Sequence, residues 1–142
     1  MTQKPKPTKG LHHVALYVKN FAECAHFYTA LLGMKVIWQP DADNLYLSSG
    51  NDNLALHRAP AEFSPASDQR LDHIGFFLSA REEVDQWYAY LSAQGADLKA
   101  APKDHRDGTR SLYCADPDGN VVQMIYYPTT TDFPTNTTSA VR

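Results

Sequence analysis

The sequence predicts an α+β protein of two β-α-β-β-β modules, whose mixed β-sheets form a curved, half-open barrel with the helices on the outside. The segments Leu11–Val18 and Leu71–Leu78 have the same pattern sixty residues apart, which indicates one strand repeated twice. An amphipathic segment follows each strand, and Gly33 and Gly95 end these two segments. A sheet backed by a single helix leaves its other face uncovered, which favours pairing of two sheets around a pocket.

The first module is expected over residues 10–59. Its helix is predicted by apolar residues at three- and four-residue steps: Phe21, Cys24, Ala25, Tyr28, Leu31 and Leu32. Three short runs of strand character follow, at Met34–Gln39, Leu45–Ser49 and Asn53–Arg58. A polar linker over residues 60–69 then leads into the second module.

The second module is expected over residues 70–128. Its helix carries apolar residues at the same steps: Val84, Trp87, Tyr88 and Leu91. Its later strands are predicted at Ala96–Ala100, Thr109–Ala115 and Asn120–Tyr127. The last two strands are joined by Asp116–Gly119, in which proline sets φ and glycine takes the position of positive φ. Residues 1–9 are expected to be flexible, and residues 129–142 form a Thr-rich tail expected to be disordered.

Composition places the chain among ordinary globular proteins. It has 142 residues, 43% of them hydrophobic, and a net charge of -3, which gives no electrostatic case for binding nucleic acid or an anionic membrane. No stretch approaches the ~18 apolar residues that span a bilayer. The chain begins without a secretory pattern, and Cys24 and Cys114 have no metal-binding spacing, so we expect a cytoplasmic protein with reduced cysteines.

Strand alternation gathers polar side chains on one face of each sheet. His13 and Tyr17 share a face of the first strand, and His73 and Phe77 share the matching face of the fifth. Imidazoles at equivalent places in two repeats would lie near the axis that relates the modules, close enough for one metal ion to bridge them. The last strand adds Gln123 on a face of its own strand.

These segments resemble the vicinal oxygen chelate superfamily, which includes glyoxalase I, fosfomycin and bleomycin resistance proteins, and extradiol dioxygenases. The resemblance covers about residues 10–128 and rests on five segments: Leu11–Val18, Phe27–Tyr28, Leu31–Met34, Asp72–Phe76 and Asp116–Gln123. In metal-binding members, a histidine of the first strand, a histidine of the fifth and a glutamate of the eighth hold a divalent ion. The resemblance therefore implies a zinc, nickel, manganese or iron ion at His13 and His73.

Gln123 stands where that glutamate usually stands. An amide oxygen can bind a hard or borderline cation but adds no negative charge, and the amide cannot act as a general base near neutral pH. The chain is thus expected to be a divalent-metal-dependent lyase, isomerase or transferase that acts on a small, oxygen-rich substrate chelated through adjacent oxygens. The alternative is a metal-free binding protein similar to the bleomycin resistance proteins. Ring cleavage by ferrous iron requires a carboxylate ligand, which the glutamine disfavours.

Further residues are candidates for the substrate pocket. His57 lies one pleat beyond Ala55, near the place where glyoxalases have a fourth ligand, and is expected to be a pocket base or a substrate contact. The loop that leads to the seventh strand brings three groups that could meet an anionic substrate: His105, Arg106 and Arg110. Candidates for an aromatic wall are Tyr17, Trp38, Tyr46, Phe77 and Tyr113. Sheet edges of this kind commonly pair across two chains, so we expect a homodimer.

Overall fold

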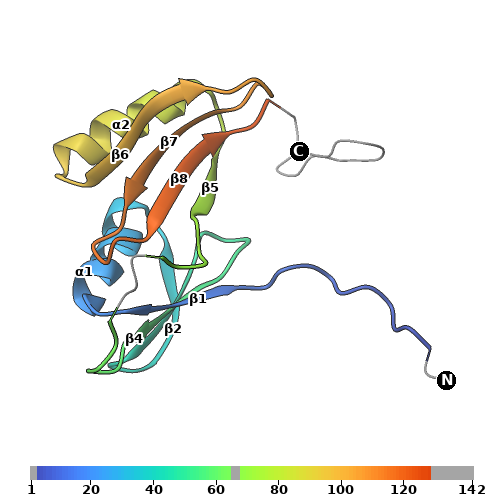
Figure 1. The fold of residues 1–142 in the computed structure, drawn as a ribbon, viewed down its shortest axis with the longest axis vertical. Helices are drawn as coiled ribbons and strands as arrows, with labels where there is room; N and C mark the ends of the chain where they lie inside the picture. Colours follow the sequence, from blue (N-terminus) through green and yellow to red (C-terminus); the bar gives the residue numbers. More distant parts are fainter. Residues whose placement is uncertain (1–2, 65–67, 129–142) are drawn as a thin grey trace. The chain divides into compact units, whose positions relative to one another are not determined.

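The computed structural model describes residues 3–64 and 68–128, which form two compact units with a boundary between Phe63 and Ser64 (Figure 1). Each unit is one β-α-β-β-β module with its own four-stranded mixed sheet, so the α+β fold class and the repeat are confirmed. Neither sheet closes into a barrel by itself. The joining of both sheets into one half-open barrel stays a prediction, and the expected tail over 129–142 lies outside the described residues.

The first unit has its strands in the order β1-β4-β3-β2, with β1 parallel to β4 and the other pairs antiparallel. Its elements are β1 Val14–Val18, α1 Phe21–His26, the π-helical turn η1 Phe27–Leu31, β2 Lys35–Asp41, β3 Asn44–Ser48 and β4 Leu54–Arg58. The helical segment is continuous as expected, but its second half is wound more widely. There the Thr29 hydroxyl donates to the carbonyl of Ala25 at 2.6 Å, a side-chain bond of the kind that bends helices.

One face of the first sheet forms the core of the first unit. Helix α1 packs against β4, and the alternation of each strand turns its leucines and valines toward the helix. The buried strand residues on this face are Leu16, Val18, Leu45, Leu47, Leu54 and Leu56. The opposite face of the same strands carries polar and aromatic side chains.

The second unit repeats this plan in the order β5-β8-β7-β6. Its elements are β5 Ile74–Leu78, α2 Glu82–Ala93, β6 Asp97–Asp104, β7 Arg110–Ala115 and β8 Val121–Tyr126. Gly95 follows α2 with a φ of 76°, so it ends the helix as predicted. None of the described helices is long and apolar enough to cross a membrane.

Strand β6 extends four residues beyond the predicted end at Ala100, and this part of the sequence was expected to be loop. β6 is an edge strand, where Pro102 is tolerated because the missing N–H has no neighbour to satisfy. Two register shifts against β7 accommodate the added length. Lys103 and Asp104 are therefore held by the sheet.

The turn between β7 and β8 is fixed by a buried carboxylate. Asp116, 3% exposed, accepts hydrogen bonds at 2.9 Å from the backbone N–H groups of Asp118 and Asn120 and from the Asn120 side chain. Gly119 has a φ of 91°, as the predicted hairpin requires. The turn thus holds β8, and with it Gln123, in register with β7.

Both cysteines are buried thiols. Burial, with a smaller contribution from Asp116, raises the pKa of the Cys114 thiol to about 11. This thiol is therefore protonated at neutral pH and is a packing group of the core.

Candidate functional site

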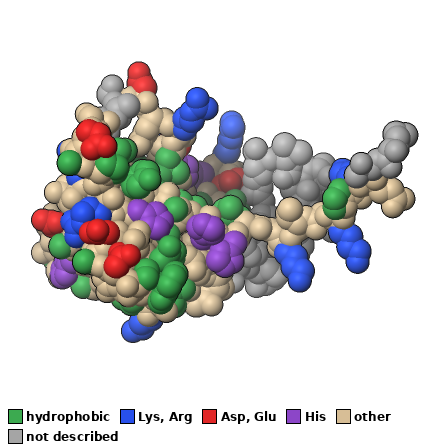
Figure 2. Space-filling view, turned by 90° about the horizontal axis from the view of Figure 1, so that it is seen from below, with side chains coloured by type: hydrophobic (Ala, Val, Ile, Leu, Met, Phe, Trp, Pro, Cys, Tyr) green, Lys and Arg blue, Asp and Glu red, His purple; other side chains and the backbone are tan. Residues whose placement is uncertain are grey.

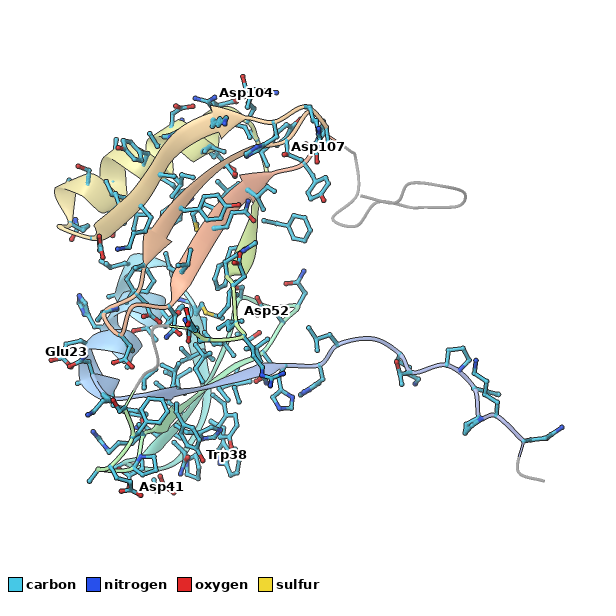
Figure 3. The ribbon with its side chains drawn as sticks, viewed as in Figure 1. Glu23, Trp38, Asp41, Asp52, Asp104 and Asp107 are labelled. Carbon is cyan, nitrogen blue, oxygen red and sulfur yellow. The ribbon has the colours of Figure 1, made fainter. Side chains whose placement is uncertain are left out.

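The open face of the second sheet carries the polar residues that the sequence places there. Gly75 of β5 and Tyr113 of β7 both pair with Gln123 of β8, so the three residues share one face. Above β6, β7 and β8 lies an open hollow of about 760 Å³. It is lined by Lys103, Asp104, His105, Arg106, Asp107, Thr109, Tyr113, Gln123 and Ile125. Figure 3 shows Asp104 and Asp107 at the end of the sheet where β6 leads into β7.

The Gln123 side chain is held in one orientation on this face. Gln123 is 9% exposed, and its Nε2 donates to the Tyr113 hydroxyl at 2.9 Å and to Ser111 Oγ at 3.1 Å. Its Oε1 lies over Gly75, where a Cβ would come within 3.3 Å of it. No hydrogen bond from a described residue reaches Oε1, and no buried side-chain atom there lacks a partner, so this oxygen is an acceptor open to the hollow.

Ser111 extends the network to the loop. Its hydroxyl lies 2.8 Å from His105 Nε2. Ser111 as a whole is 1% exposed. Because Ser111 Oγ accepts from Gln123, its own proton can be donated to His105 Nε2. His105 lines the hollow, and Ser111 links it to Gln123.

His73 precedes β5 on the same face. Its Nδ1 lies 2.6 Å from Asp72 Oδ2, and its ring meets the Tyr113 ring edge-on at 5.5 Å. When Nδ1–H donates to the carboxylate, Nε2 keeps a lone pair, which is the arrangement of most metal-ligating histidines. Asp72 is 94% exposed, so water competes with this bond. Tyr113 thus contacts both His73 and Gln123.

In the first unit the predicted pocket residues also share one face. Tyr17 of β1 and Asn44 of β3 both pair with His57 of β4. The His57 Nδ1 atom lies 2.6 Å from Asn44 Oδ1. Ala55, which pairs with Tyr46, is fully buried beneath this face and offers no ligand atom.

His13 lies just before β1, which begins at Val14. It is exposed, and its Nδ1 lies 2.9 Å from Nδ1 of His12, so one of the two nitrogens carries the proton and the other accepts it. Within the described ranges 3–64 and 68–128, no three His, Cys, Asp or Glu side chains gather as a group that could hold a metal ion. The assembly of His13, His73 and Gln123 into one site therefore stays a prediction.

Arg110 was expected at the pocket, but the structure places it against the helix. Its guanidinium donates to both oxygens of Asp85 on α2, at 2.8 and 3.0 Å, and to Asp104 at 3.0 Å. Asp104 also pairs with Arg81. Alternation explains this position, because Arg110 is next to Ser111 and so faces the other side of β7.

Two residues that sequence reasoning missed hold the predicted ones in place. Ser111 orients Gln123, and Asn44 orients His57. Ser111 lies two residues before Tyr113, so strand alternation would have found it on the same face. Asn44 had no such signal, because its alignment with His57 depends on the β3–β4 register.

Comparison with known proteins agrees with this architecture. Residues 10–124 match the family model described as the glyoxalase/bleomycin resistance protein/dioxygenase superfamily. The chain belongs to this superfamily, whose members include the vicinal oxygen chelate enzymes.

Among curated proteins, the chain is 23% identical to the metallothiol transferase FosB of Staphylococcus saprophyticus over 122 residues, which cover 82% of this chain and 76% of that protein. Among solved structures, lactoylglutathione lyase from Agrobacterium tumefaciens has a TM-score of 0.69 at 21% identity, covering 85% of this chain and 96% of that one. A glyoxalase-related enzyme from Fulvimarina pelagi has a TM-score of 0.69 at 18% identity, covering 85% and 90%. The structural similarities show a common fold.

The ion pairs of Arg110 predict a specific dependence of stability on pH. Hydrogen bonds from Arg110 hold the pKa of Asp85 and of Asp104 below the ordinary value of 3.8, with a further contribution from Arg81 at Asp104. A carboxyl with a lowered folded-state pKa stabilises the fold above its unfolded pKa, and this contribution is lost as pH falls toward the folded value. As the pH falls below about 4, we expect the free energy of unfolding to decrease less for Arg110→Met than for the wild type.

Urea denaturation at several pH values between about 7 and 3 measures this effect. Arg106→Met is the matched control, because Arg106 has no ion pair among the described residues. Parallel stability profiles for the wild type and Arg110→Met would contradict the assignment.

Proposed function

We propose that this protein is a divalent-metal-dependent lyase, isomerase or transferase that acts on a small, oxygen-rich substrate held through adjacent oxygens. One observation carries the proposal: His73, with Nδ1 on a carboxylate, and Gln123, with Oε1 open to the hollow, share one face and contact the same tyrosine. Superfamily membership and similarity to proteins named as a metallothiol transferase and a lactoylglutathione lyase support it.

The proposed ligands are His13 of the first unit with His73 and Gln123 of the second. Imidazole nitrogens and an amide oxygen suit borderline cations, which include zinc, nickel, manganese and iron. A bound ion would act as a Lewis acid on the substrate oxygens. Since all three ligands are neutral, the ion keeps its charge, so affinity without substrate should be low. An anionic, bidentate substrate should raise the affinity for metal. Thermodynamic linkage then requires the bound metal to raise the affinity for that substrate by the same factor.

Other side chains have roles that follow from their places. Gln123 cannot take up a proton, so we assign the base to His57, whose Nε2 keeps its lone pair while Nδ1 bonds to Asn44. At the hollow, Lys103, His105 and Arg106 supply N–H donors for an anionic part of the substrate.

The alternative is a metal-free binding protein of the bleomycin resistance kind. It is favoured by the hydrogen bonds that satisfy the Gln123 amide N–H groups without any ion. In that case Oε1 would accept a hydrogen bond directly from the ligand.

Calorimetric titration of chelator-stripped protein with zinc, manganese, nickel and ferrous iron separates the two functions. We expect Gln123→Glu to strengthen metal binding by about 1 to 3 kcal/mol, because it restores a charged ligand. We expect His13→Ala and His73→Ala to abolish binding. His26→Ala is the matched control, since His26 is exposed on α1.

If Gln123→Glu binds metal no better than the wild type, or if both ligand histidine variants bind as the wild type does, these residues are not a metal site. The ligand-binding function would then replace the enzymatic one.

We further propose a cytoplasmic homodimer. The buried thiols of Cys24 and Cys114 fit a reducing compartment. The edge strand β2 is exposed along its whole length, with Val36 and Ile37 each more than half exposed. An exposed apolar edge favours closed twofold pairing. Sedimentation equilibrium should give twice the chain mass of 15.9 kDa, and a mass that stays at 15.9 kDa at all concentrations would rule the dimer out.

A further inference from the structure

Five aromatic side chains form a continuous row across the open face of the first sheet. We call this row the aromatic platform: Trp38, Tyr46, His57, Tyr17 and Phe63. Trp38 stacks on Tyr46 with ring centroids 5.1 Å apart and planes at 27°. Tyr46 meets His57 edge-on at 5.8 Å, His57 meets Tyr17 at 6.4 Å, and Tyr17 lies against Phe63 at 5.9 Å. The row crosses every strand of the sheet.

The platform presents a large apolar surface. Trp38 is 59% exposed and Tyr17 is 58% exposed, although both are large aromatic residues. Figure 2 shows histidine side chains beside hydrophobic ones on the face that it presents, and Figure 3 shows Trp38 and Asp41 on the same side of the first unit. Because Trp38 stacks on Tyr46 and is still more than half exposed, its ring can accept a second planar group by stacking.

His57 supplies a hydrogen-bond acceptor within the platform, and the contacts of Asn44 decide which of its ring nitrogens carries the proton. Asn44 Nδ2 donates to both oxygens of Asp41, at 2.8 and 3.0 Å, which sets the orientation of the Asn44 amide. Asn44 Oδ1 can only accept, so His57 Nδ1 carries the proton of this 2.6 Å bond. In the neutral ring His57 Nε2 then has a lone pair, and no described residue donates to it.

We propose that the aromatic platform binds a planar aromatic ring that carries a hydroxyl group. The ring stacks on Trp38, and the hydroxyl donates its proton to His57 Nε2. An aliphatic ligand would not stack, and an aromatic ligand without a donor would leave Nε2 desolvated and unpaired, which is costly. The inference rests on the proposed function only in that the ligand is a small molecule. The platform belongs to one unit and requires no metal ion.

Three small probes separate these contributions. Phenol has the ring and the donor, anisole has the ring alone, and cyclohexanol has the donor without a planar ring. Each is titrated at millimolar concentration into chelator-stripped, full-length protein, and the indole N–H resonance of Trp38 is followed by NMR. We expect phenol to give a saturable shift of the Trp38 resonance. Anisole should bind about two- to tenfold more weakly, because it cannot donate the hydrogen bond. Cyclohexanol should give no saturable shift.

Two variants test the assigned contacts. His57→Phe keeps a ring but removes the acceptor, so phenol and anisole should bind equally. Trp38→Leu should weaken binding of both probes by about two- to tenfold, the effect of one aromatic pair. In this variant the ring resonances of Tyr46, on which Trp38 stacks, replace the missing indole as the reporter. Trp87→Leu is the matched control, because Trp87 lies on α2 against Tyr90, outside the platform.

The proposal fails if cyclohexanol binds as well as phenol, if the shifts occur at Trp87 and not at Trp38, or if His57→Phe keeps the preference for phenol. It also fails if raising the protein concentration displaces bound phenol from Trp38, since a second copy of the chain would then cover the platform. Every probe is titrated into metal-free protein, so the two proposals are tested separately. If phenol does not bind to the platform, the proposed metal site is not affected. If the metal titration shows no binding, the phenol result is not affected.

Discussion

The structure depends on one constraint: each four-stranded sheet has a single helix, which can cover only one of its faces. Leucines and valines therefore gather on the helix side, where Leu47 and Val122 are fully buried. The other face is left for residues that make directed contacts. In the second unit these contacts are hydrogen bonds around Gln123, and in the first they are ring contacts around His57. The repeated module thus yields two chemically different surfaces from the same arrangement of strands.

Gln123 links the fold to the proposed chemistry. Gly75 leaves room for its oxygen, and the hydroxyls of Ser111 and Tyr113 hold its nitrogen, so the amide presents Oε1 to the hollow without having to reorganise. A glutamate at this position would bring a negative charge against the same two hydroxyls, which would then both have to donate. The present arrangement suits a neutral ligand oxygen, and this favours a weakly held ion whose affinity rises with an anionic substrate.

Strand alternation allowed the sequence to predict much of the fold and part of the site. Alternation put His73 and Phe77 on one face of the fifth strand, because a period of two is set by backbone geometry. The sixty-residue repeat predicted the order of the elements. Alternation did not predict the full length of β6, because proline is found in strands mainly at sheet edges and Pro102 therefore did not indicate a strand. Arg110 was assigned to the pocket although the predicted strand Thr109–Ala115 contains it, because alternation was not applied to this residue. Periodicity within a strand does not determine whether His13 lies near His73, because the two residues belong to different units.

We propose that one divalent ion binds to residues contributed by both modules. Anomalous X-ray scattering at the metal's absorption edge, from crystals of protein purified without added metal or chelator and then loaded with zinc, locates any ion directly. We expect one ion with nitrogen atoms of His13 and His73 and the oxygen of Gln123 at about 2.0 to 2.2 Å, whether His13 comes from the same chain or from a second copy. An ion held by other residues, or no ion at these residues in zinc-saturated crystals, would contradict it.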